Sequence, residues 1–316
     1  MKDFAGKIAV ITGGGTGMGR ELALQLTAEG CTVALCDVSA ENMAETKARA
    51  EAHAPQGTRV VTFVADVSIE DQLKAFAAAV AHELQTDHIH LLFNNAGIGG
   101  GGSMVDGDRA QWDKTFNVCW GGVYYSTRAF LPLLKKANEA HIVNTSSVNG
   151  FWASLGPGRP HTAYSAAKFA VKGFTEALIA DLALNAPHIK CSVVMPGHIG
   201  TEIVTNSRKI LSGSETAVDV DAVRRALAAQ GAKVGDLTDD QIRGFVAEQA
   251  RRFHDDAPMT AAEAATVILD GVRQDRWRIL VGKDAEVIDN LVRAQPEKAY
   301  TPEFFAELAK GTGWRV

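Results

Sequence analysis

Short apolar runs alternate along the chain with longer segments whose apolar residues recur every three or four positions. The first run, Lys7 to Thr12, leads into a segment in which Leu22 and Leu26 are four residues apart. Continuous apolar runs of this length are typical of buried strands, and the recurring spacing is typical of helices packed against them. The alternation predicts an α/β fold with right-handed crossovers and a parallel sheet.

Glycines gather where the first predicted strand gives way to a helix. Gly13, Gly17 and Gly19 form the spacing Gly-x-x-x-Gly-x-Gly. Glycines in such a turn let the backbone approach a pyrophosphate, and the N-terminus of the following helix attracts its negative charge. A flexible glycine-rich loop is the alternative, but the flanking strand and helix favour a dinucleotide site.

The second predicted strand ends in an acidic residue, Asp37, 18 residues after Gly19. A carboxylate at this distance from the glycine turn accepts hydrogen bonds from the adenosine ribose and repels a 2′-phosphate. Val38 follows, where a basic residue would have served that phosphate. The nearby cation Arg20 argues instead for NADP. We therefore expect NAD as the cofactor, with NADP as the alternative.

Tyr164 and Lys168 are four residues apart, so on a helix they lie on one face, one turn from each other. A nearby ammonium favours the phenolate and lowers the pKa of a tyrosine toward the working pH. The pair is therefore a candidate general acid and base for a substrate hydroxyl or carbonyl. Alone the spacing is weak, because such a pair is common on solvated helix faces, and its weight comes from the other motifs.

Taken together, the motifs resemble those of the short-chain dehydrogenase/reductase family, in the family's order. They are Thr12-Gly13-x-x-x-Gly17-x-Gly19, Asn94-Asn95-Ala96-Gly97, a serine before the tyrosine, Tyr164-x-x-x-Lys168 and Pro196-Gly197. The resemblance is strong over residues 4–201 and weak over 258–282. It implies a doubly wound, Rossmann-type parallel sheet of about seven strands flanked by helices, in one catalytic domain spanning 1–282.

The resemblance also implies roles for individual residues. Tyr164 exchanges the proton, Lys168 lowers its pKa, and Ser147 holds the reacting oxygen, with Ser146 as the alternative to Ser147. The carbonyl of Asn117 helps hold a water of the proton relay. The residues expected to contact the cofactor are Gly13, Thr16, Gly17, Met18, Gly19, Asp37, Asp66, Val67, Asn94, Ala96, Gly97, Tyr164, Lys168, Pro196, Gly197, Ile199 and Thr201.

The implied activity is hydride transfer between the nicotinamide of NAD and a secondary alcohol or ketone. Three alternatives remain: an NADP-dependent ketoreductase, a dinucleotide-binding sensor or scaffold without turnover, and an epimerase or dehydratase acting on nucleotide sugars. The set Asn117, Ser147, Tyr164 and Lys168 favours an enzyme over a scaffold. The glycine spacing argues against the nucleotide-sugar enzymes, which usually have a different spacing and a larger C-terminal domain.

Three segments depart from the family pattern. The Gly/Pro run 155–161 lengthens the loop before Tyr164, which makes Trp152 and His161 candidate substrate neighbours. The segment 202–257, with Phe245 among its apolar residues, is predicted to be a helical substrate lid, and a large lid suggests a bulky or hydrophobic substrate. A helical pair that packs on another subunit is the alternative. Residues 283–316 form a C-terminal extension.

Composition narrows the classes of partner and location that remain. The chain has 316 residues, a net charge of −5 and no basic cluster, which argues against nucleic acid or an anionic membrane as a partner. We expect no signal peptide, no membrane span and a cytoplasmic protein. The four scattered cysteines and nine histidines show no metal spacing, so no metal is expected. By analogy with the family, a homodimer or homotetramer is expected through helices at about 108–136 and 163–185.

Overall fold

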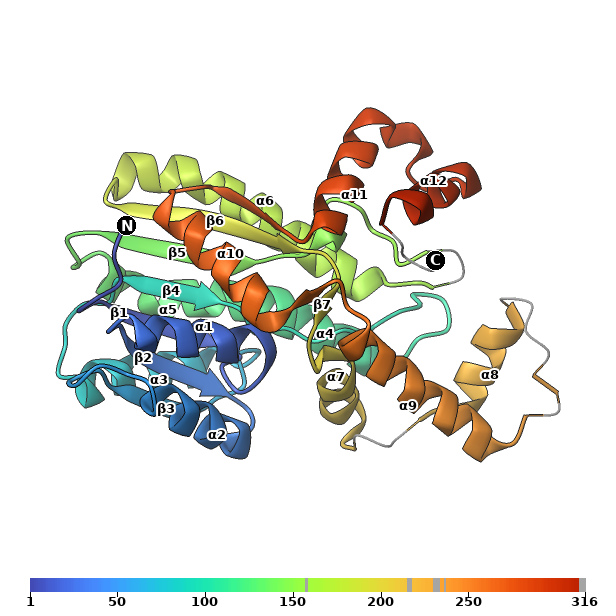
Figure 1. The fold of residues 1–316 in the computed structure, drawn as a ribbon, viewed down its shortest axis with the longest axis horizontal. Coiled ribbons are helices and arrows are strands. Elements are labelled where there is room, and N and C mark those ends of the chain that lie inside the picture. The colour runs from blue at the N-terminus through green and yellow to red at the C-terminus, as the bar shows by residue number, and fades with distance from the viewer. Residues whose placement is uncertain (157–158, 215–217, 230–233, 236, 313–316) are drawn as a thin grey trace.

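Seven parallel strands form the central sheet of the chain (Figure 1). The structure, a computed structural model, describes the chain except residues 157–158, 215–217, 230–233, 236 and 313–316. The order across the sheet is β3-β2-β1-β4-β5-β6-β9, which confirms the predicted doubly wound topology. The strands are β1 (Ile8–Thr12), β2 (Thr32–Asp37), β3 (Val60–Val64), β4 (Leu91–Asn94), β5 (Ala140–Thr145), β6 (Ile189–Pro196) and β9 (Arg278–Val281).

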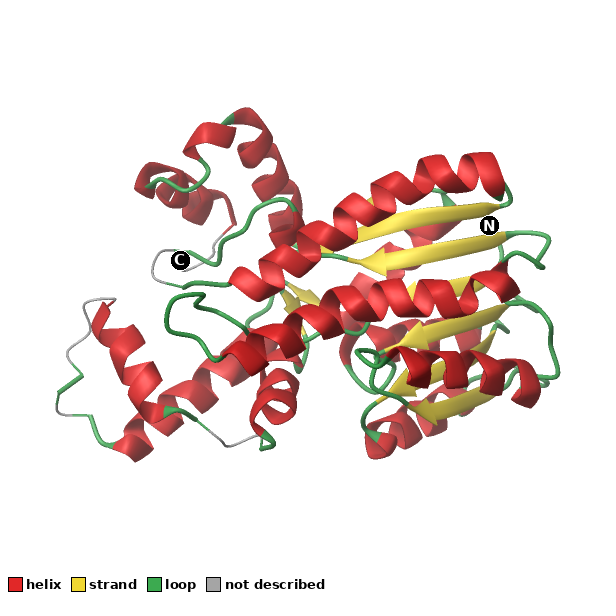
Figure 2. Cartoon of the chain, turned by 180° about the vertical axis from the view of Figure 1, so that it is seen from behind, coloured by secondary structure: helices red, strands yellow, loops and turns green. Residues whose placement is uncertain are grey.

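Helices cover both faces of the sheet, which is why most strand residues are buried. On one face lie α1 (Gly17–Ala28), α2 (Ala40–Glu51) and α10 (Ala261–Arg273), and on the other lie α3 (Glu70–Glu83), α5 (Gly122–Leu134) and α6 (Thr162–Asn185) (Figures 1 and 2). Leu22 and Leu26 of α1 are buried in the first layer with Ile268 of α10. Phe76 of α3 and Phe130 of α5 fill the second layer.

The strand order reverses direction between β1 and β4, and the carboxyl ends of all seven strands meet at one edge of the sheet. In a doubly wound sheet, a ligand binds in the crevice that this reversal creates. The glycine turn follows β1, and Ser147 follows β5. The fold therefore gathers the predicted motifs at one edge.

One continuous helical stretch changes its winding in the middle. It begins as α4 (Arg109–Phe116), loosens into a π-helical turn over Asn117–Gly121, and continues as α5. A π turn holds one residue more than an α turn and is often found at functional sites. The amide of Gly122 donates to the carbonyl of Asn117, five residues back.

The inserted segment 202–257 contains three helices in its described part, where the sequence indicated two. They are α7 (Ile203–Ser212), α8 (Val220–Ala229) and α9 (Asp239–Asp255). We call α8 and α9 the arm, because both views show them extending away from the sheet (Figures 1 and 2). The guanidinium of Arg224 on α8 donates to the carbonyls of Val234 and Leu237 at 3.0 and 2.8 Å, which ties the arm together.

The C-terminal extension packs on the segment after β5. It comprises α11 (Lys283–Ala294), a 3-10 turn (Pro296–Lys298) and α12 (Pro302–Thr312). Its core contains Trp152, whose exposed fraction is 0% and whose indole nitrogen donates to the carbonyl of Ala299 at 2.7 Å. Trp152 thus anchors the extension, so its position does not support the expected contact with substrate.

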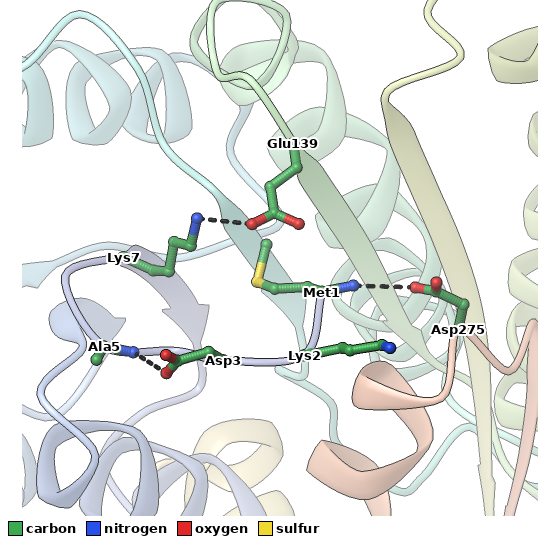
Figure 3. Close-up of a pocket in the computed structure, with 7 residues that line it drawn as sticks. All are labelled: Met1, Lys2, Asp3, Ala5, Lys7, Glu139 and Asp275. Carbon is green, nitrogen blue, oxygen red and sulfur yellow. Dashed lines mark hydrogen bonds and ion pairs between the residues drawn. The ribbon is translucent and has the colours of Figure 1, made fainter.

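A pocket near the first residues lies at the opposite edge of the sheet, before the strands begin (Figure 3). Lys7 binds Glu139 there at 2.6 Å, and the amino group of Met1 binds Asp275 at 3.2 Å. None of the predicted site residues lines it. In the part of the chain that the structure describes, no helix combines the length and the apolar composition needed to cross a membrane.

Candidate active site

The predicted catalytic side chains Ser147, Tyr164 and Lys168 lie together at the carboxyl edge of the sheet. The Lys168 ammonium is 2% exposed, donates to the carbonyl of Thr145 at 2.8 Å and lies 5.4 Å from the centroid of the Tyr164 ring. The side chain of Ser147 acts on Tyr164 and lowers the pKa of its phenol. Ser146 instead donates its hydroxyl to the backbone carbonyl of Lys168 at 2.7 Å, so it braces α6.

Burial controls the protonation of the tyrosine. It raises the pKa of Tyr164 well above its usual range; the nearby Cys119 side chain adds to the rise, and the Ser147 side chain opposes it. This is opposite to the expected lowering by Lys168. The reason is geometric, because the ammonium lies over the ring and is bonded to Thr145. Tyr164 therefore carries its proton and is placed to donate it.

Cys119 is a site residue that the sequence did not reveal. It lies in the π turn, is fully buried, and its thiol donates to the carbonyl of Ile98 at 3.2 Å. A Cβ atom added to Gly97 would lie 3.4 Å from the Lys168 nitrogen and 3.7 Å from the Cys119 sulfur. The thiol, the ammonium and Gly97 thus enclose one small volume. Sequence spacing alone gave no signal for this cluster.

Asn117 begins the π turn two residues before Cys119. Its side chain is exposed, and its carbonyl already accepts the amide of Gly122. A carbonyl oxygen has two lone pairs, so the Asn117 carbonyl can accept a second hydrogen bond. The predicted relay role of Asn117 is compatible with this geometry and remains a prediction.

Two further candidates for substrate contact have different surroundings. The ring of His161 lies 4.7 Å from the ring of Tyr164, and burial lowers the pKa of His161 to about 4, so the imidazole is neutral at neutral pH. Phe245 is 41% exposed on α9, which extends away from the sheet. The structure therefore brings His161 to the site and leaves Phe245 outside it.

The backbone of the glycine turn is shaped so that a ligand can approach it closely. Gly13 has a φ of +68°, and its amide and that of Gly14 donate to the carbonyl of Cys36 at 2.8 and 3.1 Å. A Cβ atom on Gly19 would lie 2.0 Å from the carbonyl oxygen of Gly13. The N-cap Thr16 makes no side-chain capping bond, and the first turn of α1 has no acidic residue. These features fit the pyrophosphate of a dinucleotide.

The predicted ribose-binding residue lies beside this turn. The Asp37 carboxylate accepts the amides of Gly15 and Ser39, both at 3.0 Å. Arg20, the cation that argued for NADP, is paired with Glu45 through bonds of 2.7 and 2.9 Å. The Arg20 side chain is 11% exposed, so the cation is largely covered. A carboxylate and a neutralised guanidinium suit free ribose hydroxyls better than a phosphate.

Two residues that were predicted to contact the cofactor are hydrogen bonded to other side chains of the protein. Burial raises the pKa of Asp66, but hydrogen bonds from Lys114 and Ser68 outweigh it, and the pKa lies below its usual value. Asn94 is 1% exposed, and its amide nitrogen donates to Thr127 and Asn144 at 3.0 and 2.8 Å. The Asn94 side chain therefore braces the sheet from within.

The remaining predicted contacts surround the same cleft from loops that follow strands or from the start of α1. The amide of Ala96 donates to the Thr12 hydroxyl at 3.1 Å. Met18 packs on the core beneath the glycine turn. Val67 is buried, and a Cβ atom on Gly122 would lie 2.8 Å from its side chain.

The segment Pro196–Thr201, which we call the nicotinamide loop, is joined to distant parts of the chain. The amide of Gly197 donates to Val281 at 2.9 Å, and that of His198 donates to the Asp284 carboxylate at 2.7 Å. The His198 ring is hydrogen bonded to the carbonyl of Phe253 at 2.7 Å. Ile199 and Gly200, the short strand β7, pair with β8 (Met259–Thr260).

Helix α7 follows this loop and is bonded to the glycine turn and to the segment after β4. Asn206 donates to the Thr16 hydroxyl at 2.9 Å, and Ser207 accepts the amide of Gly99 at 2.8 Å. Thr201 lies against the glycine turn, since a Cβ atom on Gly17 would be 3.2 Å from its methyl carbon. Asn206, Ser207 and Asp284 were all missed from sequence, because their partners are distant along the chain.

Comparisons with known proteins agree with this geometry. Residues 7–211 match the family model described as short chain dehydrogenase. A protein named as an oxidoreductase, SadH, from Mycobacterium tuberculosis is 34% identical over 314 residues, which is 99% of each chain. Levodione reductase from Leifsonia aquatica is 35% identical over 209 residues, covering 66% of this chain and 75% of the relative.

A solved structure extends the likeness to almost the whole chain. It is the crystal structure of a short chain dehydrogenase/reductase from Burkholderia phymatum in complex with NAD, 29% identical, with a TM-score of 0.76. The alignment covers 96% of this chain and 98% of that one. The likeness therefore includes the arm and the C-terminal extension as well as the sheet. The chain belongs to the short-chain dehydrogenase family and is an oxidoreductase of that family.

Proposed function

We propose that the protein is an NAD-dependent oxidoreductase that transfers a hydride between the nicotinamide and a secondary alcohol or ketone. The observation that carries this proposal is the group Ser147, Tyr164 and Lys168 at the carboxyl edge of the sheet, with the Lys168 nitrogen 5.4 Å from the centroid of the Tyr164 ring. A scaffold needs a dinucleotide cleft but no buried proton donor aimed into it. When bound, the nicotinamide supplies the hydride chemistry.

The residues of this chain then have separate tasks. Tyr164 gives its proton to the carbonyl oxygen during ketone reduction and removes a proton from the alcohol during oxidation. Ser147 donates a hydrogen bond where negative charge develops on that oxygen. Lys168, held by the carbonyl of Thr145, keeps a positive charge beside the tyrosine ring and lies near the expected nicotinamide ribose.

NAD is favoured over NADP by the surroundings of the second strand. Asp37 ends that strand, and the carboxylate of Glu45 binds the nearby guanidinium of Arg20. The substrate is proposed to be a bulky or hydrophobic ketone or alcohol. The neutral His161 ring beside Tyr164 adds no charge on that side of the site, and a relative is named levodione reductase.

An assay panel tests the proposal directly. Secondary alcohols and ketones of graded size are tested with both dinucleotides, and absorbance of the reduced nicotinamide is followed. Turnover of ketones with NADH, lost in Tyr164→Phe, is the expected result. Binding of NADH without turnover on any member of the panel would instead favour the dinucleotide-binding scaffold.

We also propose that the protein forms a homodimer or homotetramer through α5 and α6. Tyr124 on α5 and Phe169 on α6 are 40% and 42% exposed, so each helix presents a partly exposed ring. Native mass measurement of the wild type and of Phe169→Glu tests this. A wild type that is monomeric at micromolar concentration would contradict it.

A further inference from the structure

A buried carboxylate from the C-terminal extension lies against the nicotinamide loop. Asp284 is 3% exposed in the first turn of α11. One carboxylate oxygen accepts the amide of His198 at 2.7 Å, and the other accepts the amide of Ala285 at 2.9 Å. Hydrogen bonds to an ionised acceptor are about twice as strong as neutral ones. This contact therefore fixes the loop backbone firmly.

The packing around this carboxylate leaves no room for a side chain on either neighbour. A Cβ atom on Gly197 would lie 2.3 Å from both carboxylate oxygens of Asp284. A Cβ atom on Gly282 would lie 2.4 Å from one of them, and Gly282 has a φ of +103°. The loop and the start of α11 therefore fit together as one surface, with the carboxylate between them.

The same helix also supports the segment that carries the catalytic serine. Val148 directly follows Ser147 and is buried in one cluster with Ala285 and Ile288 of α11. Asp284 is next to Ala285, so the start of α11 contacts the nicotinamide loop and the serine segment at once. A shift of α11 would move both parts of the site together.

We propose that Asp284 is a positioning residue for hydride transfer, through which the C-terminal extension holds the nicotinamide loop in register with Ser147. This inference rests on the proposed function, since it assumes a nicotinamide in the cleft. Asp284 acts through the backbone of His198, so it is not a catalytic residue. The C-terminal extension is then part of the active-site framework.

A second buried carboxylate on the same helix provides a matched control. Asp289 is 6% exposed and accepts bonds from Arg278 and Arg293, both at 2.9 Å. It ties α11 to β9 without touching the nicotinamide loop. A variant at Asp289 therefore loosens the helix in the same general way, while the contact with His198 stays in place.

The test compares Asp284→Ala, Asp284→Asn and Asp289→Asn with the wild type. NADH affinity is measured by fluorescence titration, and amide exchange is followed at residues 196–201. In Asp284→Ala we expect the His198 amide to lose protection and NADH affinity to fall by about tenfold, the scale of one lost charge-assisted hydrogen bond. On the best ketone of the panel, kcat should fall by up to ~10²-fold while KM for the ketone changes little.

Asp284→Asn keeps an oxygen that can accept the His198 amide but loses the negative charge, so its losses of affinity and protection should be smaller than those of Asp284→Ala and larger than those of Asp289→Asn. If Asp284→Ala fails to fold, Asp284→Asn decides the question against Asp289→Asn with the same readouts. Equal losses of NADH affinity in both asparagine variants would overturn the inference, and so would an unchanged His198 amide in Asp284→Ala. A wild type that binds neither NADH nor NADPH would refute the proposed function instead.

Discussion

The guanidinium of Arg20 is bound by the carboxylate of Glu45 through two hydrogen bonds of 2.7 and 2.9 Å. The same guanidinium also donates to the carbonyl of Gly15 in the glycine turn, at 2.7 Å. The cation beside the glycine turn is therefore already paired with an acid. We propose that the choice between NAD and NADP depends on two acidic residues, Asp37 and Glu45.

Glu45→Gln should narrow the preference for NAD, because it frees the charge of Arg20 for a 2′-phosphate. Asp37→Ala should narrow it as well, and Asp37→Ala with Val38→Arg should move it toward NADP. The measurement is kcat/KM with each cofactor. Glu41→Gln, on the same helix as Glu45, serves as the control. A wild-type enzyme that already prefers NADP would contradict the proposed roles of Asp37 and Glu45.

Tyr164→Phe keeps the ring and removes the transferable proton. Turnover should fall by roughly 10²–10⁴-fold, the range of general acid–base catalysis, while NADH binding changes little. Because burial raises the pKa of Tyr164, the donating form persists at alkaline pH. We therefore expect the wild-type rate of ketone reduction to stay flat through mildly alkaline pH, and a fall beginning near neutral pH would contradict this assignment.

Folding stability should decrease as the solution is acidified, in part through His141. This residue is 1% exposed, and burial lowers its pKa from 6.5 to about 4. The unfolded chain binds the proton first, so the contribution of His141 is fully present above pH 6.5 and is lost as pH falls toward 4. The loss amounts to about 3 kcal/mol at most.

Urea unfolding at both ends of this pH range, in the wild type and in His141→Gln, measures the effect. The glutamine variant should show a smaller difference between the two pH values. His82, which is 79% exposed, provides the control as His82→Gln. Equal pH dependence in the wild type and in His141→Gln would mean that other groups account for the acid sensitivity.

Helix α7 should govern the release of cofactor, because it bonds both to the glycine turn and to the segment after β4. Asn206→Ala with Ser207→Ala removes the contacts to Thr16 and Gly99. Each lost hydrogen bond is worth about 1 kcal/mol, so the loss of both should make NADH dissociate roughly thirtyfold faster. Stopped-flow displacement of NADH measures this rate. Ser212→Ala, at the end of the same helix, should leave it unchanged.

Phe245→Ala should leave KM for ketones of every size unchanged, since α9 carries this ring away from the site. This differs from the expectation drawn from sequence that residues 202–257 as a whole form a substrate lid. Kinetics on the graded panel and native mass together decide it. A raised KM for large ketones would show that α9 belongs to a substrate lid after all. A weakened oligomer would show instead that the arm contacts another subunit.

Local patterns predicted the sheet well. Most residues of β1 to β4 are apolar, and an apolar run needs no distant partner to be recognised. Tyr164 and Lys168 were placed together by helical spacing alone. The seven parallel strands and the family were both predicted correctly.

Features that depend on tertiary contacts were not predicted. Trp152 was expected at the mouth of the site, but its cover comes from Phe304 and Phe305 of α12, far along the chain. Asp284 reaches a loop residue 86 positions earlier. The sequence also predicted a lowered pKa for Tyr164, whereas in the protein without cofactor burial raises it. The extent of burial depends on the folded surroundings and cannot be read from the spacing of Tyr164 and Lys168.

The π turn at Asn117–Gly121 sets the phase between two halves of one continuous helix. Upstream, the indole of Trp112 donates to Thr162 at 3.0 Å, next to the start of α6. Downstream, Ser126 and Thr127 face Asn94 in the sheet. Deleting one residue from this turn would let the helix wind regularly and would rotate its first half by about 100° relative to its second. Trp112 would swing off Thr162 while α5 stayed in place, so the length of this turn, more than its composition, aligns the sheet with the start of the catalytic helix.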